Sequence, residues 1–114
     1  MLIKLIRSFS AAHQLPNYNG PCRDLHGHTW KAVFVLEGAV RSDGMVGDFK
    51  TLKKVLDGVL PDHQFLNDLL PNPTAENLAS FLFQKANQAL VPMQLRVKSL
   101  EIWESDNAAA IVEG

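Results

Sequence analysis

The first 28 residues hold three of the four histidines and the only cysteine of the chain. They are His13, Cys22, His26 and His28, residue types that bind metals or, for cysteine, act as a nucleophile. Residues two apart in an extended segment point to the same side, so His26 and His28 present both imidazoles in one direction. His13 would lie beside them if the segments before and after the intervening loop pair as antiparallel strands.

This trio of imidazoles predicts a metal site. Three neutral nitrogen ligands in tetrahedral positions are typical of catalytic zinc, with the fourth position left to water or substrate. Imidazole also binds iron, copper and nickel, so the ligand type alone leaves the metal open. The alternative is that each histidine satisfies only local hydrogen bonds. The residues alone leave both interpretations open: a zinc site formed by His13, His26 and His28, or three separately hydrogen-bonded histidines.

Cys22 has two functional interpretations. As a fourth ligand it would close the site and make it structural, whereas as a separate thiolate it would react beside an open site. It lies in a loop rich in proline, glycine and asparagine, next to Arg23 and near the expected cation. Such surroundings stabilise a thiolate, although a lone cysteine is more commonly a small buried apolar residue. We favour the functional interpretations over simple packing.

Two further groups could take part in acid and base chemistry. Asp62 directly precedes His63, and a carboxylate beside an imidazole can orient it for proton transfer near neutral pH. The alternative is a solvated turn. Glu104 lies at the end of a predicted strand, where it is either an exposed charge or a carboxylate that accepts two N–H donors from a planar ligand.

Hydrophobic periodicity and turn residues predict four strands and two helices to position these groups. The strands are expected over residues 2–10, 27–37, 95–104 and 107–114, and the helices over 49–60 and 75–90. Asp48 and Thr74 stand where N-cap residues would accept hydrogen bonds from the first turn of each helix. The apolar phase of the third strand shifts near Ser99, which indicates a β-bulge.

The order of these elements, ββααββ, lacks the alternation of strands and helices that gives a parallel sheet. It predicts an α+β fold in which a four-stranded antiparallel sheet carries both helices on one face. The length of the chain predicts a single domain over residues 1–114. One face and two edges of the sheet would stay uncovered, so we also expect self-association.

Composition limits the partners. The 114 residues carry a formal net charge of −1, so there is no broad positive field for nucleic acid or an anionic membrane. A single cysteine allows no internal disulfide, which suits a reducing compartment, and no apolar run is long enough to span a bilayer. The sequence therefore predicts a cytoplasmic protein.

Six motifs, taken together, resemble the 6-pyruvoyltetrahydropterin synthase family over nearly the whole chain. They are His13, CRDLHGH (22–28), GMVGDF (44–49), PDHQFLN (61–67), NPTAENLA (72–79) and WES (103–105). The C-x-x-x-H-x-H spacing is closer to the bacterial 6-carboxy-5,6,7,8-tetrahydropterin synthase branch. The resemblance implies the tunnelling fold, in which sheet edges join into trimeric barrels and two barrels stack into a homohexamer.

The resemblance also implies a zinc-dependent lyase. Its reaction would convert 7,8-dihydroneopterin triphosphate to 6-carboxy-5,6,7,8-tetrahydropterin, releasing triphosphate and acetaldehyde, for queuosine and deazapurine synthesis. The family pattern assigns catalysis to Cys22 and the Asp62–His63 pair, pterin binding to Glu104, and zinc to the three histidines. It also implies active sites that lie between subunits.

Two other functions stay open. The pyruvoyl branch uses the same site to eliminate triphosphate without breaking a carbon–carbon bond, and a non-catalytic zinc module would use Cys22 as a fourth ligand. Two positions also depart from the family pattern. Pro61 replaces a leucine and could shift the Asp62–His63 pair, whereas Ser105 replaces a threonine and keeps its hydroxyl.

Overall fold

The computed structural model describes residues 1–15, 20 and 24–114, so Cys22 lies outside the described residues. Within them, the strands are β1 (Leu2–His13), β2 (His26–Glu37), β3 (Gln64–Phe65), β4 (Arg96–Ser105) and β5 (Ala108–Glu113). The helices are α1 (Phe49–Val59) and α2 (Ala75–Leu90), with short 3-10 turns η2 (Leu66–Asp68) and η3 (Val91–Met93). All four predicted strands and both predicted helices are therefore present.

The strands form one mixed sheet in the order β3-β1-β2-β4-β5. β1, β2, β4 and β5 pair antiparallel, as predicted, and β3 adds a short parallel pairing with β1. The prediction of a purely antiparallel, four-stranded sheet is wrong in this respect. A two-residue strand is too short to show a periodic pattern, and its pairing of Gln64 with Ala11 depends on tertiary structure.

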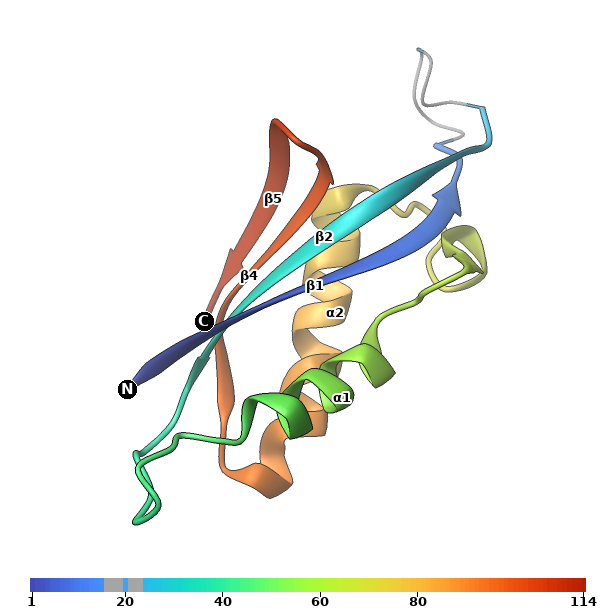
Figure 1. The fold of residues 1–114 in the computed structure, drawn as a ribbon. Helices are drawn as coiled ribbons and strands as arrows, with labels where there is room; N and C mark the ends of the chain where they lie inside the picture. The colour runs from blue at the N-terminus through green and yellow to red at the C-terminus, as the bar shows by residue number, and fades with distance from the viewer. Residues whose placement is uncertain (16–19, 21–23) are drawn as a thin grey trace.

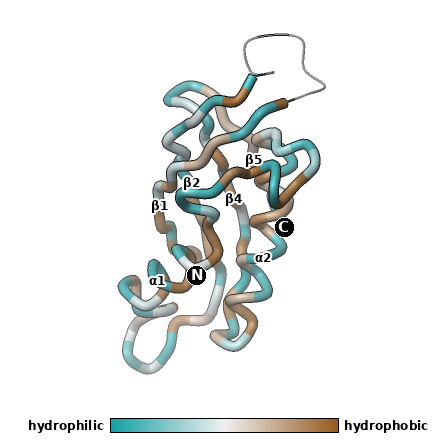
Figure 2. The backbone as a smooth tube through the Cα atoms, turned by 90° about the vertical axis from the view of Figure 1, so that its right-hand side faces the viewer, coloured by the Kyte–Doolittle hydropathy of each residue, from teal (hydrophilic) through white to brown (hydrophobic). Residues whose placement is uncertain are grey.

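Both helices cover the same face of the sheet, which confirms the predicted α+β class. α2 packs on β4 and β5, and α1 packs on β1 and on α2 (Figure 1). Along β2, alternation directs Trp30, Phe34 and Leu36 to this face, where they are fully buried. Figure 2 shows hydrophobic residues recurring along β2, β4 and α2, where the two layers meet.

Both helices begin at the predicted caps. The Asp48 carboxylate accepts a hydrogen bond from the Thr51 N–H, and the Thr74 hydroxyl accepts one from the Asn77 N–H. Phe49 belongs to the predicted apolar stripe of α1 but is 53% exposed, because it occupies the first position of the helix, at the border of the core. Among the described residues, no helix is long and apolar enough to cross a lipid bilayer.

Two register shifts shape β4. The first lies beside Ser99, where Lys98 is an extra residue opposite β2, and it confirms the bulge predicted there. The second lies between Trp103 and Ser105, where Glu104 is an extra residue opposite β5. A bulge bends its strand and redirects the local side chain, so the direction of Glu104 depends on this second irregularity.

Candidate metal centre

The register of the β1–β2 hairpin brings the three predicted histidine ligands together. His13 is aligned with His26 across the two strands, and His28 is aligned with Ala11. The three imidazoles share the face that carries the buried Trp30, and their ring centroids lie 4.5 to 5.2 Å apart. The antiparallel pairing expected from the sequence is thus what places these rings side by side.

Two backbone carbonyls fix the orientation of the His13 and His26 rings. His13 Nδ1 lies 2.8 Å from the carbonyl oxygen of Pro73, and His26 Nδ1 lies 2.7 Å from that of Asp24. Because a carbonyl can only accept, each Nδ1 carries the proton and each Nε2 presents a lone pair. The two Nε2 atoms are 2.9 Å apart. Facing lone pairs at this distance repel unless both bind a cation, so the arrangement fits a metal ion.

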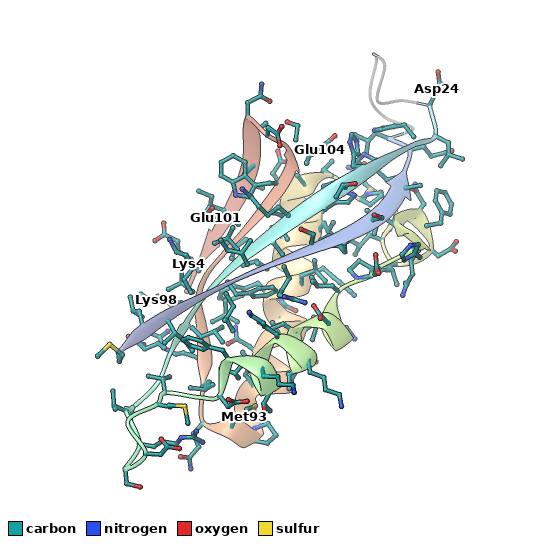
Figure 3. All side chains as sticks on the ribbon, in the orientation of Figure 1. Lys4, Asp24, Met93, Lys98, Glu101 and Glu104 are labelled. Carbon is teal, nitrogen blue, oxygen red and sulfur yellow. The ribbon has the colours of Figure 1, made fainter. Side chains whose placement is uncertain are left out.

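Glu104 adds a carboxylate to the cluster. Its Oε1 lies 3.0 Å from His28 Nε2 and 3.7 Å from His13 Nε2. His28 Nε2 is nevertheless buried without a hydrogen-bond partner in the part of the chain that the structure describes. The ligand atoms of His13, His26, His28 and Glu104 all lie within 4.8 Å of one another, so these four residues could hold one metal ion. Figure 3 shows Glu104 near the end of β4 that leads into the β4–β5 turn.

Trp30 forms a wall of this histidine and glutamate cluster. Its ring meets the rings of His13 and His28 edge-on at centroid distances of 5.1 and 5.2 Å, and its Nε1 donates to the Ala11 carbonyl. Burial lowers the pKa of His28, which keeps the imidazole neutral, as a metal ligand must be. The sequence analysis missed Trp30 as a site residue, although its position two residues after His28, on the same face, was a usable signal.

The Asp62 and His63 side chains contact each other at the edge of the sheet. Asp62 Oδ2 lies 3.0 Å from His63 Nδ1, and Asp62 Oδ1 accepts a hydrogen bond of 2.8 Å from the Ser10 N–H. The Ser10 N–H, assisted by His63, holds the pKa of Asp62 below its usual value. His63 has a left-handed backbone (φ 58°), and its N–H donates to the Ser10 carbonyl. Pro61 therefore does not prevent the pairing.

An open cavity of about 600 Å³ is lined by His63 of this pair and by His28 of the cluster. Its lining includes Ser10, Ala12, Gly27, His28, Thr29 and His63. A Cβ atom at Gly27 would meet nothing within 4 Å, so the glycine between the two histidines leaves the cavity unobstructed. The volume is typical of a site for a small molecule. One ligand in this cavity could thus contact both His28 and His63.

Asn67 connects the two parts of the site and was not singled out by the sequence analysis. Its side chain accepts a hydrogen bond from the Gln14 N–H (3.0 Å) and donates one to the Gln14 carbonyl (2.9 Å). Gln14 follows His13 directly, and Asn67 lies four residues after His63. This pair of bonds ties the end of β1 to the loop that carries the Asp62–His63 pair.

Replacing Asn67 with alanine is therefore expected to loosen His13 as well as the loop. We expect zinc affinity to fall about tenfold, the lower end of the range for residues that orient metal ligands. Zinc titration against a competing chelator measures this. Asn87→Ala is the matched control, because Asn87 also accepts a backbone hydrogen bond, from Val97, at the far end of the helical layer. Equal zinc affinities for the two variants would contradict the role given to Asn67.

Comparison with known proteins gives the relatives of this chain. The family described as 6-pyruvoyl tetrahydropterin synthase matches residues 2–114. The chain is 41% identical over 113 residues to the 6-carboxy-5,6,7,8-tetrahydropterin synthase of Synechocystis sp., covering 90% of this chain and 85% of that relative. It is 38% identical over 108 residues to the dihydroneopterin monophosphate aldolase of Pyrococcus furiosus, covering 93% and 91% of the two chains.

A solved structure of a protein with the family's name has the same fold. The structure of Caenorhabditis elegans 6-pyruvoyl tetrahydropterin synthase superposes with a TM-score of 0.86 at 27% identity, over all of this chain and 95% of the other. The motif resemblance found in the sequence is confirmed by both comparisons.

Proposed function

This chain is an enzyme of the 6-pyruvoyl tetrahydropterin synthase family, and from that premise we propose that it is a 6-carboxy-5,6,7,8-tetrahydropterin synthase. Its substrate would be 7,8-dihydroneopterin triphosphate, and its products 6-carboxy-5,6,7,8-tetrahydropterin, triphosphate and acetaldehyde. One observation carries the proposal: ligand atoms of His13, His26 and His28 lie within 4.8 Å of one another, and His28 also lines a cavity that His63 lines. The Synechocystis relative named for this reaction supports the choice of branch.

We propose zinc as the metal because the donors are three neutral imidazoles and a carboxylate, a set that zinc accepts. His13, His26 and His28 would hold it. A bound zinc ion would supply Lewis-acid stabilisation of charge that develops on substrate oxygens. The carbonyls of Pro73 and Asp24 would keep two of the imidazoles in the protonation state that the metal requires.

The remaining groups would move protons and hold the ring. Cys22, as a thiolate, would remove a proton from the carbon chain of the substrate, and His63, oriented by Asp62, would serve as the second acid and base group. Glu104 would accept N–H donors from the edge of the pterin. The cavity that His63 shares with His28 supports the role proposed for His63.

We also propose a homohexamer assembled through sheet edges. Among the described residues, β5 pairs only with β4, and residues 2–9 of β1 pair only with β2, so both edges keep free backbone groups. Leu2, Ile6 and Ile111 are at least half exposed. Light scattering should give six times the 12.6 kDa of one chain. A monomer at micromolar concentration would contradict the assembly.

The decisive experiment for the reaction is incubation of the zinc-loaded protein with 7,8-dihydroneopterin triphosphate, followed by mass analysis of all products. The proposal predicts one acetaldehyde and one triphosphate for each 6-carboxytetrahydropterin formed. Triphosphate release without acetaldehyde would indicate the pyruvoyl reaction instead. Because the Pyrococcus furiosus relative is named as a monophosphate aldolase, 7,8-dihydroneopterin monophosphate should be tested in parallel. Turnover of the monophosphate alone would overturn the proposed substrate.

Alkylation distinguishes the enzyme from a non-catalytic zinc module. If Cys22 is a free thiolate, iodoacetamide should modify the zinc-loaded protein rapidly, abolish turnover and leave the zinc in place. A protected thiol, or loss of zinc on modification, would support the structural role.

A further inference from the structure

We propose that Glu104 exchanges between two partners: it is a metal ligand when no substrate is bound and a pterin ligand when substrate arrives. The inference rests on the proposed function, since it needs a metal ion and a pterin that share one site. It goes further in assigning two successive roles to one carboxylate. The set of atoms that bind the metal would then depend on whether the pterin position is filled.

The first observation is where the carboxylate of Glu104 points. Oε1 lies 3.0 Å from His28 Nε2 and 3.7 Å from His13 Nε2, so among the described residues this carboxylate faces two ligand nitrogens of the cluster. Its side chain is 26% exposed, so the carboxylate is partly removed from water. A carboxylate in that position adds a negative charge to three neutral imidazoles, which stabilises a bound divalent cation.

The second observation is a cavity that Glu104 lines. A separate cavity of about 240 Å³ is bounded by Glu104, by Ala75 and Glu76 at the start of α2, and by residues 108–110 of β5. Glu104 is thus a wall shared by this alanine-lined cavity and the metal cluster. A planar ring placed there would meet the small apolar side chains of four alanines and the carboxylates of Glu104 and Glu76, which accept N–H donors.

The third observation explains how the side chain can reach both places. Glu104 is the extra residue of the β4–β5 bulge, between Trp103 and Ser105, so its backbone is outside the regular ladder. No described residue donates a hydrogen bond that would anchor the carboxylate in one position. A change of side-chain rotamer therefore meets little resistance, in contrast to His13, whose ring is fully buried and bonded to Pro73.

The test uses cobalt(II), whose visible absorption reports its donor set, in the full-length protein. Without pterin, Glu104→Gln and Glu104→Ala should change the cobalt band and weaken cobalt binding at least tenfold. Adding a pterin that lacks the C6 side chain should shift the wild-type band toward that of Glu104→Gln. The same pterin should leave the band of Glu104→Gln unchanged.

Glu76→Gln is the matched control, because Glu76 borders the same alanine-lined cavity and is no part of the cluster. Its cobalt band should equal that of the wild type, and circular dichroism should show that every variant is folded. The proposal is overturned if Glu104→Gln leaves the cobalt band unchanged. It is also overturned if pterin fails to bind, binds without shifting the wild-type band, or shifts the band of Glu104→Gln equally.

These outcomes are independent of turnover. A protein that shows the exchange but leaves 7,8-dihydroneopterin triphosphate unchanged would refute the proposed reaction and not the exchange. A protein that turns this substrate over with a cobalt band insensitive to Glu104 would refute only the exchange.

Discussion

Replacing His13 with alanine is expected to lower zinc affinity by at least about 100-fold and to abolish turnover. Loss of a residue that merely orients a ligand costs about 10- to 100-fold in metal affinity, so loss of a ligand should cost at least the upper value. His13 is also the most deeply placed of the cluster, with no exposed surface and its Nε2 close to both His26 and Glu104. Zinc titration and product analysis measure the two effects.

Two further variants, His26→Ala and His63→Ala, distinguish loss of the metal from unfolding of the protein. His13→Ala leaves the Pro73 carbonyl without its donor, which costs about 1–3 kcal/mol for a buried acceptor. His26→Ala removes a partly exposed ligand and should lose zinc with a smaller loss of stability. His63→Ala is the matched control, since it removes the exposed histidine outside the cluster. Unchanged zinc affinity in both ligand variants would refute the metal site.

Replacing His63 with alanine is expected to lower kcat by about 10²- to 10⁴-fold, the usual contribution of a positioned acid or base, with zinc affinity unchanged. The geometry supports an effect on kcat without an effect on zinc affinity. His63 lines the larger cavity together with His28, but its side chain pairs with Asp62 and, among the described residues, with no residue of the cluster. Steady-state kinetics with parallel zinc titration measure both quantities.

Asp62→Asn should also lower kcat, because an amide removes the carboxylate charge that faces His63 Nδ1 at 3.0 Å. The backbone anchor survives, since the amide oxygen can still accept from the Ser10 N–H at the position of Oδ1. Wild-type kcat in both variants would exclude the pair from the reaction. A loss of zinc in His63→Ala or Asp62→Asn would show that the Asp62–His63 pair also supports the metal cluster.

The sequence was informative wherever a local rule decided the structure. Alternation placed His26 and His28 on one face, and antiparallel pairing of the flanking strands then aligned His13 with His26. Asp48 and Thr74 marked the helix starts because a side-chain oxygen at that position satisfies the free N–H groups of the first turn. Each of these features depends on residues that are close together in the sequence. The residue pattern alone was therefore sufficient to predict them.

The sequence was uninformative where distant segments meet. The Pro73 carbonyl reaches His13 across sixty residues, and a backbone acceptor leaves no mark in side-chain pattern. The parallel pairing of β3 depends on the return of the loop to the β1 edge. Glu104 was expected at a strand end, but its proximity to the imidazoles depends on a bulge between Trp103 and Ser105 that shows no phase shift in a short alanine-rich strand.

The most direct test of the central claim is X-ray absorption at the zinc edge of the zinc-loaded, substrate-free protein. If the three imidazoles hold the metal while the Cys22 thiolate stays outside its coordination sphere, the spectrum should fit nitrogen and oxygen neighbours at about 2.0–2.2 Å, with imidazole scattering and no sulfur. A sulfur neighbour at about 2.3 Å would contradict the account. It would replace a metal centre open to substrate with a closed structural one.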